Sequence, residues 1–250
     1  MNPNPRFAEL DYRRTALGDL ILRRRTLPAL ENIEVYEIIL GDAFLMTSLF
    51  TAVEEALSKL GLAAAAEAFP ADGMLDVVVG GLGLGHTARA ALDHPGTGSL
   101  IVVDFLEPVI EWHQQGLVPL GRDLSDDPRC RFVHGDFFEL ALAANGDAGF
   151  DPDRAGRKFH AILLDIDHSP TNLLHERHAG FYQADGLRKV AAKIHPGGVF
   201  ALWSDEPPAE EFMTALNEVF VSCESHVVTF HNPHQDRTSA STVYVARTGA

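Results

Sequence analysis

The order of apolar and polar positions changes near residue 74. From there on, short and nearly continuous apolar runs alternate with segments of helical spacing. The predicted strands are 74–79, 99–103, 130–134, 160–164 and 198–203, and the predicted helices are 86–93, 107–116, 136–144, 181–194 and 208–220. Apolar runs without alternation are typical of strands buried on both faces, so this region predicts a mostly parallel sheet in a doubly wound α/β fold.

Two further predicted strands end the chain, at 225–230 and 241–246, and the turn-rich segment 231–240 joins them. A connection of that length suits an antiparallel hairpin. The sheet is therefore expected to have seven strands, with the antiparallel pair at its end.

The first part of the chain has a different pattern. Residues 17–22, 33–40 and 43–47 predict strands separated by turns. Apolar positions at helical spacing then predict a helix over 48–63, which Gly61 is expected to end. We expect a small β-rich module over residues 1–47 and a Rossmann-like domain over 48–250.

Composition narrows the function classes. The 250 residues are 46% hydrophobic and carry a formal charge of −15, so a globular protein is expected that repels nucleic-acid phosphates and anionic lipid. No apolar run reaches 18 residues, and residues 1–14 lack the apolar stretch of a signal peptide. The negative charge favours small cationic molecules as partners. With only Cys130 and Cys223, a disulfide framework is not expected and a cytoplasmic protein is.

A glycine-rich loop follows the first predicted strand of the α/β region. Gly80, Gly81, Gly83 and Gly85 lie between that strand and the next predicted helix. Glycines allow a sharp turn and a close approach of a ligand, and the helix N-terminus offers free N–H groups. The context of strand, loop and helix predicts a nucleotide-type cofactor site here.

Asp104 ends the next predicted strand, 19 residues after Gly85. An acidic residue at this place can accept hydrogen bonds from both hydroxyls of a ribose. It can also be the N-cap of the following helix. Together with the glycines, it indicates a ligand that contains an adenosine-like ribose.

Two features favour a sulfonium nucleotide over NAD. Gly135 and Asp136 follow the third strand, where a carboxylate in a methyltransferase-like fold faces the exocyclic amine of adenine; a helix cap is the alternative for Asp136. The segment His195-Pro196-Gly197-Gly198 resembles the turn before the fifth strand of methyltransferase-fold enzymes. We therefore expect S-adenosylmethionine or its decarboxylated form as cosubstrate.

Over roughly residues 30 to 247 the chain resembles the spermidine synthase (polyamine aminopropyltransferase) family. The matching segments are Val79-Gly80-Gly81, Val102-Val103-Asp104, Val109-Ile110-Glu111, Asp127-Pro128-Arg129, His134-Gly135-Asp136, Ile162-Leu163-Leu164-Asp165, Ser169-Pro170, Phe181-Tyr182 and Pro196-Gly197-Gly198. The resemblance implies a class I methyltransferase fold preceded by an N-terminal β module, aminopropyl transfer to a small amine, and a homodimer.

Two positions depart from the family pattern. The family's glycine loop carries an Asp that helps hold the amine tail of the cosubstrate, and Gly83 stands there in this chain. The family's catalytic loop reads Asp-Ser-Ser-Asp-Pro, and this chain has Asp165-Ile166-Asp167-His168-Ser169-Pro170. The second aspartate, the family's base and amine anchor, falls on His168.

Candidate chemistry follows the fourth strand. Transfer from a sulfonium needs alignment of the nucleophile and exclusion of water, and an amine nucleophile must also lose a proton. Asp165, Asp167 and His168 are the candidates, because ligands bind beyond the carboxyl ends of such strands. If the strand continued, alternation would bring Asp165 and Asp167 to one side, where paired carboxylates could bind an ammonium. A turn-capping role is the alternative.

Three further residues are candidates for the acceptor pocket: Trp203 and Asp205 after the fifth strand, and Tyr182, which matches the family's Tyr-rich substrate wall. His175 and His178 are three residues apart, but no zinc signature accompanies them, so no metal is expected and a polar lid is favoured.

The sequence leaves several functions open. An aminopropyltransferase comes first, and a small-molecule methyltransferase is the alternative that Gly83 and His168 favour. A non-catalytic nucleoside-binding relative and a dinucleotide-dependent oxidoreductase are the other two.

Overall fold

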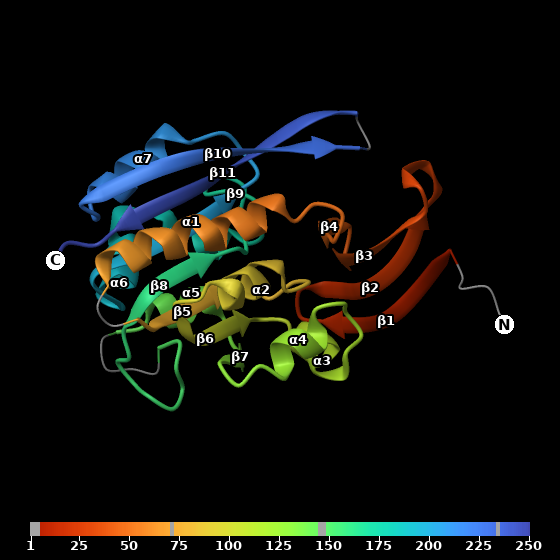
Figure 1. Ribbon diagram of the computed structural model, residues 1–250, viewed down its shortest axis with the longest axis horizontal. Helices are drawn as coiled ribbons and strands as arrows, with labels where there is room; N and C mark the ends of the chain where they lie inside the picture. The colour runs from red at the N-terminus through yellow and green to blue at the C-terminus, as the bar shows by residue number, and fades with distance from the viewer. Residues whose placement is uncertain (1–5, 71–72, 145–148, 234–235) are drawn as a thin grey trace.

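The computed structural model describes residues 6–70, 73–144, 149–233 and 236–250, in two sheets (Figure 1). Residues 1–5, where the predicted N-terminal module begins, and residues 234–235 of the predicted hairpin loop lie outside the described residues. The predicted α/β class is confirmed, with a seven-stranded, mostly parallel sheet beside a four-stranded antiparallel one.

The four-stranded sheet is a meander in the order β1-β2-β3-β4. Its strands are β1 (Phe7–Thr15), β2 (Gly18–Leu27), β3 (Ile33–Leu40) and β4 (Ala43–Thr47), with the short 3₁₀ helix η1 (Pro28–Leu30) after β2. Leu20 and Leu22 of β2 are fully buried, whereas Phe7, Ile33 and Phe44 are about half exposed. One face of this sheet therefore packs on the rest of the molecule, and the other face meets solvent.

Helix α1 (Ala52–Ala68) extends beyond the predicted limit. The expectation that Gly61 ends this helix is wrong, because Gly61 lies in its buried middle. A Cβ at Gly61 would be 2.7 Å from Cδ2 of Leu163 and 3.2 Å from Cβ of Ala201. The glycine lets α1 approach the large sheet closely, which is a packing role rather than a stop signal.

The large sheet has the order β10-β11-β9-β8-β5-β6-β7. Its strands are β5 (Leu75–Gly80), β6 (Thr97–Asp104), β7 (Cys130–His134), β8 (Phe159–Leu164), β9 (Ile194–Ser204), β10 (Ser222–Asn232) and β11 (Arg237–Arg247). Strands β5 to β9 pair in parallel, and β11 pairs antiparallel with both β9 and β10. The predicted terminal hairpin is confirmed.

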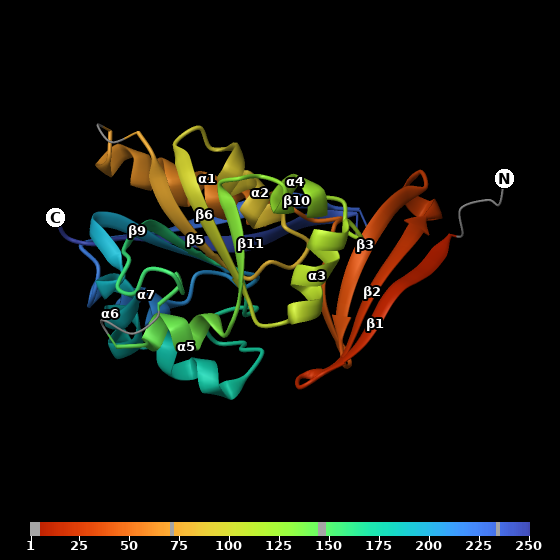
Figure 2. The ribbon, with the colours of Figure 1, turned by 90° about the horizontal axis from the view of Figure 1, so that it is seen from below.

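Helices cover both faces of the large sheet. They are α2 (His86–Asp93), α3 (Glu107–Gln115), α4 (Gly121–Ser125), α5 (Phe137–Leu142), α6 (Ala184–Ala192) and α7 (Glu210–Asn217). Figure 2 shows α1, α2 and α4 on one face and α5, α6 and α7 on the other. Each face has its own apolar core, as expected for strands that are buried on both sides.

Several boundaries differ from the sequence prediction, and two of the differences lie around the start of β9. The predicted helix 181–194 divides into the 3₁₀ helix η2 (Glu176–Tyr182) and α6, and residue 194 already begins β9. The Pro196-Gly197-Gly198 segment lies inside β9 rather than in a turn before it. Gly197 has a φ of +81°, and the β8–β9 register shifts between Phe159 and Ala161, so the glycines bend the strand at its start.

The small sheet is attached to the large domain through α3. The indole Nε1 of Trp112 donates a 2.7 Å hydrogen bond to Oδ2 of Asp11, and Arg13 forms an ion pair of 3.2 Å with Glu111. Trp112 is completely buried. This contact holds the end of the small sheet over the loops that follow β5 and β6 (Figure 1).

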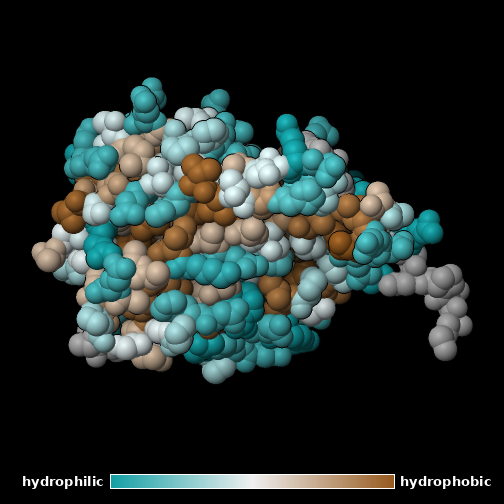
Figure 3. Space-filling model, turned by 45° about the horizontal axis from the view of Figure 1, so that its top comes forward, coloured by the Kyte–Doolittle hydropathy of each residue, from teal (hydrophilic) through white to brown (hydrophobic). Residues whose placement is uncertain are grey.

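The surface is mixed rather than strongly patterned. On the face seen in Figure 3, charged and polar side chains are interspersed with small apolar patches. Within the described ranges, no helix is both long and apolar enough to cross a membrane.

Candidate active site

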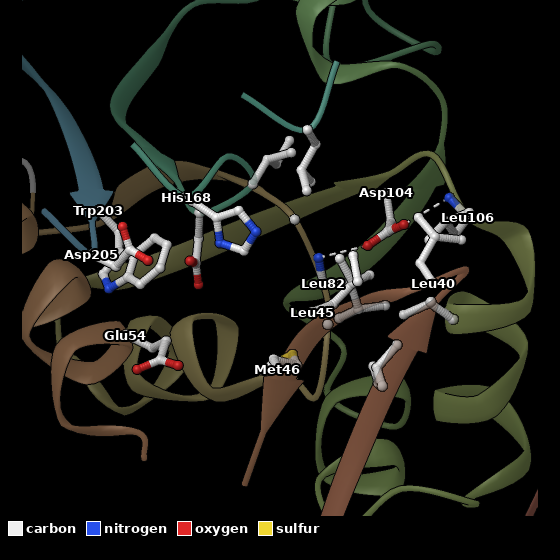
Figure 4. A pocket seen from close by; sticks show the side chains of 18 of the residues that line it. Leu40, Leu45, Met46, Glu54, Leu82, Asp104, Leu106, His168, Trp203 and Asp205 are labelled. Carbon is white, nitrogen blue, oxygen red and sulfur yellow. Dashed lines mark hydrogen bonds between the residues drawn. The ribbon is translucent and has the colours of Figure 1, made fainter. Parts of the chain in front are cut away.

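A cavity of about 660 Å³ lies where the carboxyl ends of the parallel strands meet the small sheet. Residues of β3, β4 and α1 form one wall, and the loops after β5, β6, β7, β8 and β9 form the other. Figure 4 shows two groups of side chains within it: Glu54, His168, Trp203 and Asp205 lie together, and Asp104 lies apart with Leu82 and Leu106. The carboxyl edge of a parallel sheet is the usual place for a ligand in this class of fold.

The glycine loop after β5 needs glycine for two different reasons. Gly81 has a φ of +94°, and a Cβ there would be 2.1 Å from the carbonyl oxygen of Asp165. Gly83 has a φ of +47°, and its Cβ would be 2.4 Å from Sδ of Met46. Met46 reaches in from β4, and its sulfur accepts a 3.0 Å hydrogen bond from the N–H of Leu84. The small sheet thus packs directly on the loop.

The other glycines in the prediction lie behind the cavity wall. A Cβ at Gly80 would meet the ring of Phe137 at 2.5 Å, and one at Gly85 would meet Leu124 at 2.6 Å. Gly135 donates its N–H to the carbonyl of Asp104 at 3.0 Å. These three positions shape the loops without lining the cavity, whereas Gly81 and Gly83 line it.

Asp104 lines the cavity at the end of β6, and both of its carboxylate oxygens already accept backbone hydrogen bonds. Oδ2 accepts from the N–H of Leu82 and Oδ1 from that of Leu106, each at 2.8 Å (Figure 4). Burial raises its pKa, against the lowering effect of these N–H groups. The N-cap of α3 is Leu106, so Asp104 is not the cap. A carboxylate has lone pairs left after two bonds, and these can accept from ribose hydroxyls.

Asp136 is the N-cap of α5. Its Oδ1 accepts from the N–H groups of Phe138 (2.9 Å) and Glu139 (3.2 Å). Its Oδ2 forms a 2.6 Å ion pair with Arg177 of η2, whose guanidinium also lies 5.5 Å from the centre of the Phe105 ring. Asp136 lines the cavity, but protein donors occupy both of its oxygens.

Asp165 and Glu54 form a pair of interacting carboxylates on the cavity wall. Asp165 follows β8 and accepts a 2.5 Å hydrogen bond from the hydroxyl of Thr87. Burial raises the pKa of Asp165 to about 6. Burial, together with the charge of Asp165, raises the pKa of Glu54 to about 8. At neutral pH the two carboxyl groups therefore share one proton. A bound cation would favour the ionised form of both groups.

His168, Trp203 and Asp205 line the cavity beside this pair, and we name the five residues Glu54, Asp165, His168, Trp203 and Asp205 the acidic lobe. The N–H of Asp205 donates to the carbonyl of His168 at 2.8 Å, which ties the loop after β8 to the end of β9. Burial raises the pKa of Asp205, and the charge of His168 opposes that rise.

Asp167 and Tyr182 do not line the cavity. Because β8 ends at Leu164, strand alternation does not extend to residue 167, so the condition under which Asp167 would face the same side as Asp165 is not met. Asp167 is 2% exposed and accepts from the N–H of Leu174, from the hydroxyl of Tyr182 and from Nδ1 of His178, at 2.8 to 3.1 Å. This buried network fixes the loop that carries His168.

Among the cavity residues that the sequence reasoning missed are Glu54, Met46 and Arg177. The sequence could have indicated Glu54. It lies three residues before Leu57 and four before Ser58, so it is a charged residue on the helix face that is otherwise buried. Met46 and Arg177 had no such signal, since each reaches the cavity through contacts between distant segments.

A buried histidine supports the glycine loop from behind. His113 of α3 is fully buried, and its Nε2 lies 2.9 Å from the carbonyl oxygen of Gly83. Burial lowers the pKa of His113 to about 4, so the ring is neutral and donates from Nε2.

Comparisons with known proteins bear on the fold of the chain. No family model matches the sequence. Among curated proteins, the chain is similar to Polyamine aminopropyltransferase 2 of Pseudomonas aeruginosa, with 26% identity over 164 residues. The match covers 62% of this chain and only 42% of that protein.

Solved structures agree with this match at the level of the fold. A spermidine synthase in complex with the transition-state analogue AdoDATO superposes with a TM-score of 0.69, at 16% identity over 96% of this chain and 74% of that chain. The fold is spermidine synthase-like. The Thermotoga maritima spermidine synthase also gives 0.69, at 14% identity over 96% of this chain and 73% of that chain.

The same spermidine synthase-like fold extends to methyltransferases. Human Methyltransferase-like protein 13 in complex with SAH gives a TM-score of 0.56, at 18% identity over 78% of this chain and 82% of that chain. At these identities the comparisons show the fold of this chain. They leave the donor and the acceptor to be argued from the cavity.

Proposed function

We propose that this protein transfers an aminopropyl group from decarboxylated S-adenosylmethionine to a small amine. The observation that carries the proposal is the pair of interacting carboxylates, Glu54 and Asp165, on the wall of a cavity that Asp205 also lines. An ammonium is the ligand that such a lobe favours, because it offsets the repulsion between the carboxylates.

The charge of the cavity also bears on the choice of donor. Its acidic side chains are Glu54, Asp104, Asp136, Asp165 and Asp205. Among the described residues on its wall, Arg177 is the only arginine or lysine, and it is paired with Asp136. The carboxylate of S-adenosylmethionine would find no free guanidinium or ammonium there, whereas the decarboxylated donor has no carboxylate to neutralise.

The proposed step has a simple electron balance. The amine nitrogen attacks the methylene carbon of the aminopropyl group that is bonded to sulfur. A C–N bond forms, and the bond from this carbon to sulfur breaks with its electron pair going to sulfur. The leaving group is the neutral thioether methylthioadenosine. The acidic lobe orients the amine, and Asp165 or His168 takes the proton that the nitrogen must lose. Trp203 supplies an apolar wall that excludes water.

A methyl transfer remains a second candidate because of one observation. Where the family has an aspartate to hold the amine tail of the donor, this chain has Gly83 with the sulfur of Met46 against it. The anchor for an aminopropyl tail would therefore come from the acidic lobe instead. A non-catalytic nucleoside-binding protein is the third candidate.

Calorimetric titration with S-adenosylmethionine, its decarboxylated form and methylthioadenosine separates these candidates. Tighter binding of the decarboxylated form, followed by methylthioadenosine release with a diamine, supports aminopropyl transfer. Tighter binding of S-adenosylmethionine with release of S-adenosylhomocysteine would replace it with methyl transfer. Binding without turnover over a panel of amines would favour the non-catalytic protein, and no binding of any of the three would overturn the nucleoside site.

Two other parts of the proposal concern the whole protein. We propose a homodimer that forms through the small sheet, where Phe7, Tyr12 and Ile33 are 41 to 56% exposed. Sedimentation of the wild type against a Phe7→Ser, Ile33→Ser variant tests it, and a monomer in both would exclude it. A cytoplasmic location remains a prediction from the sequence.

A further inference from the structure

Asp136, the carboxylate that the sequence predicts as the acceptor for an adenine amine, lines the cavity but already has protein partners. Both oxygens of Asp136 are occupied, by two backbone N–H groups and by Arg177. An exocyclic amine that approached Asp136 would have to compete with a charged pair of 2.6 Å.

His178 lines the same end of the cavity, next to Phe105, Asp136 and Phe138. Its ring stacks on Phe138 with 3.8 Å between the ring centres and an angle of 21°. Nδ1 lies 3.0 and 3.1 Å from the two oxygens of Asp167, which is itself almost fully buried. The histidine is therefore held on one face by an aromatic ring and on one edge by a carboxylate.

The contact with Asp167 decides what the other ring nitrogen can do. An unprotonated carboxylate accepts hydrogen bonds, so Nδ1 carries the hydrogen and Nε2 of the neutral ring is an acceptor. Among the described residues, none forms a hydrogen bond with Nε2 of His178. This nitrogen is not fully buried, so a ligand can reach it. Nε2 is therefore a preoriented acceptor at the cavity.

We propose that His178, positioned by Asp167, is the residue that recognises the 6-amino group of adenine in this protein. The inference rests on the proposed binding of an adenine nucleoside, and it assigns the selectivity for the base to Nε2 of His178 instead of to Asp136. A 6-amino group donates to Nε2, whereas the 6-oxo group of the corresponding hypoxanthine nucleoside presents a second acceptor to it.

The test compares methylthioadenosine with 5′-methylthioinosine, which has an oxygen in place of the amino group at C6 and a hydrogen on N1, in calorimetric titrations of the full chain. The wild type is expected to bind methylthioadenosine at least about tenfold more tightly, because a 6-oxo base leaves the acceptor unpaired. His178→Phe keeps the ring stack, weakens methylthioadenosine binding by about tenfold and brings the ratio of the two dissociation constants close to one. His178→Gln narrows the ratio while it retains affinity, because an amide can rotate to offer either an acceptor or a donor.

His195→Gln is the control, since His195 lies at the amino end of β9, away from the cavity. This variant is expected to keep the wild-type ratio of the dissociation constants for methylthioadenosine and 5′-methylthioinosine. Thermal melting verifies that each variant folds, and His178→Gln still tests the idea if His178→Phe does not fold. A wild-type ratio that survives in both His178 variants overturns the role of His178 while the proposed function stands. Absence of methylthioadenosine binding in the wild type overturns both.

Discussion

The hydroxyl of Thr87, in the first turn of α2, donates a hydrogen bond of 2.5 Å to Oδ2 of Asp165 at the end of β8. This bond links the helix that follows the glycine loop to the loop that carries the candidate catalytic residues. It lowers the pKa of Asp165, while burial raises it to about 6.

The first prediction concerns this bond. Thr87→Val keeps the shape of the buried side chain and removes the donor, so the pKa of Asp165 should rise further above 6. If ionised Asp165 is needed, the acid limb of kcat/KM for the amine moves to higher pH by up to about one unit. Thr97→Val is the matched control, because the buried Thr97 hydroxyl donates to the carbonyl of Ala91, away from the cavity. A limb that stays in place in Thr87→Val would contradict the role of Asp165.

The second prediction concerns the carboxylate pair. The pKa values of about 6 for Asp165 and about 8 for Glu54 predict that kcat/KM for the amine rises with pH in two steps, as each carboxyl ionises. Glu54→Gln should remove the upper step, keep the lower one and raise KM for the amine by about tenfold or more. Glu55→Gln is the control, since Glu55 pairs with Lys59 at 2.8 Å and does not line the cavity. An unchanged pH profile in Glu54→Gln would exclude the pair from amine binding.

The third prediction concerns stability. The pKa of Glu54 is raised from its ordinary 4.5 to about 8 in the folded protein, so folding favours its protonated form. That contribution is complete below about pH 4.5 and is lost as the pH rises through 8. Glu54→Gln resembles the protonated acid, so it should unfold at nearly the wild-type free energy at pH 4.5. At pH 8.5 it should be more stable by roughly 1–3 kcal/mol. Urea unfolding at both pH values measures this, and a variant less stable than the wild type at pH 8.5 would contradict it.

The fourth prediction concerns the glycine loop. A Cβ at Gly81 would be 2.1 Å from the carbonyl oxygen of Asp165, and φ is +94°, so Gly81→Ala should destabilise the fold by roughly 3 kcal/mol or more and displace Asp165. Gly156→Ala is the control, because Gly156 also has a positive φ (+70°) but nothing lies within 4 Å of its Cβ. It should cost only about 1 kcal/mol. Equal losses in urea unfolding would show that the contact with Asp165 does not matter.

Much of the fold could be predicted from local pattern. The predicted range 86–93 is that of α2, and 130–134 is that of β7. Such segments bury both faces of a strand or one face of a helix, and that burial requires apolar residues at fixed spacing. The limits failed where packing overrode the local signal, as at Gly61, where the close approach of α1 to Leu163 and Ala201 makes glycine suitable inside a helix.

The candidate site was predictable only in part. Eight of the predicted residues line one cavity, because each lies at or just after the carboxyl end of a strand of the large sheet: Gly81, Gly83, Asp104, Asp136, Asp165, His168, Trp203 and Asp205. Their binding and catalytic roles stay predictions. Asp167 and Tyr182 were expected there too, but the chain turns after Leu164 and buries them together. A one-residue change in where a strand ends decides which side chain faces the ligand, and sequence spacing does not fix that end.

The sequence by itself determined the strands of the sheet, most of its helices and the carboxyl edge that lines the cavity, since these depend on residues close together in the chain. Only the tertiary structure decided three contacts. The charge of Asp165 acts on Glu54, the sulfur of Met46 packs against Gly83, and Arg177 forms an ion pair with Asp136. Each of these contacts joins segments from different elements. Their chemistry comes from burial and from neighbouring charge, which exist only once the chain has folded.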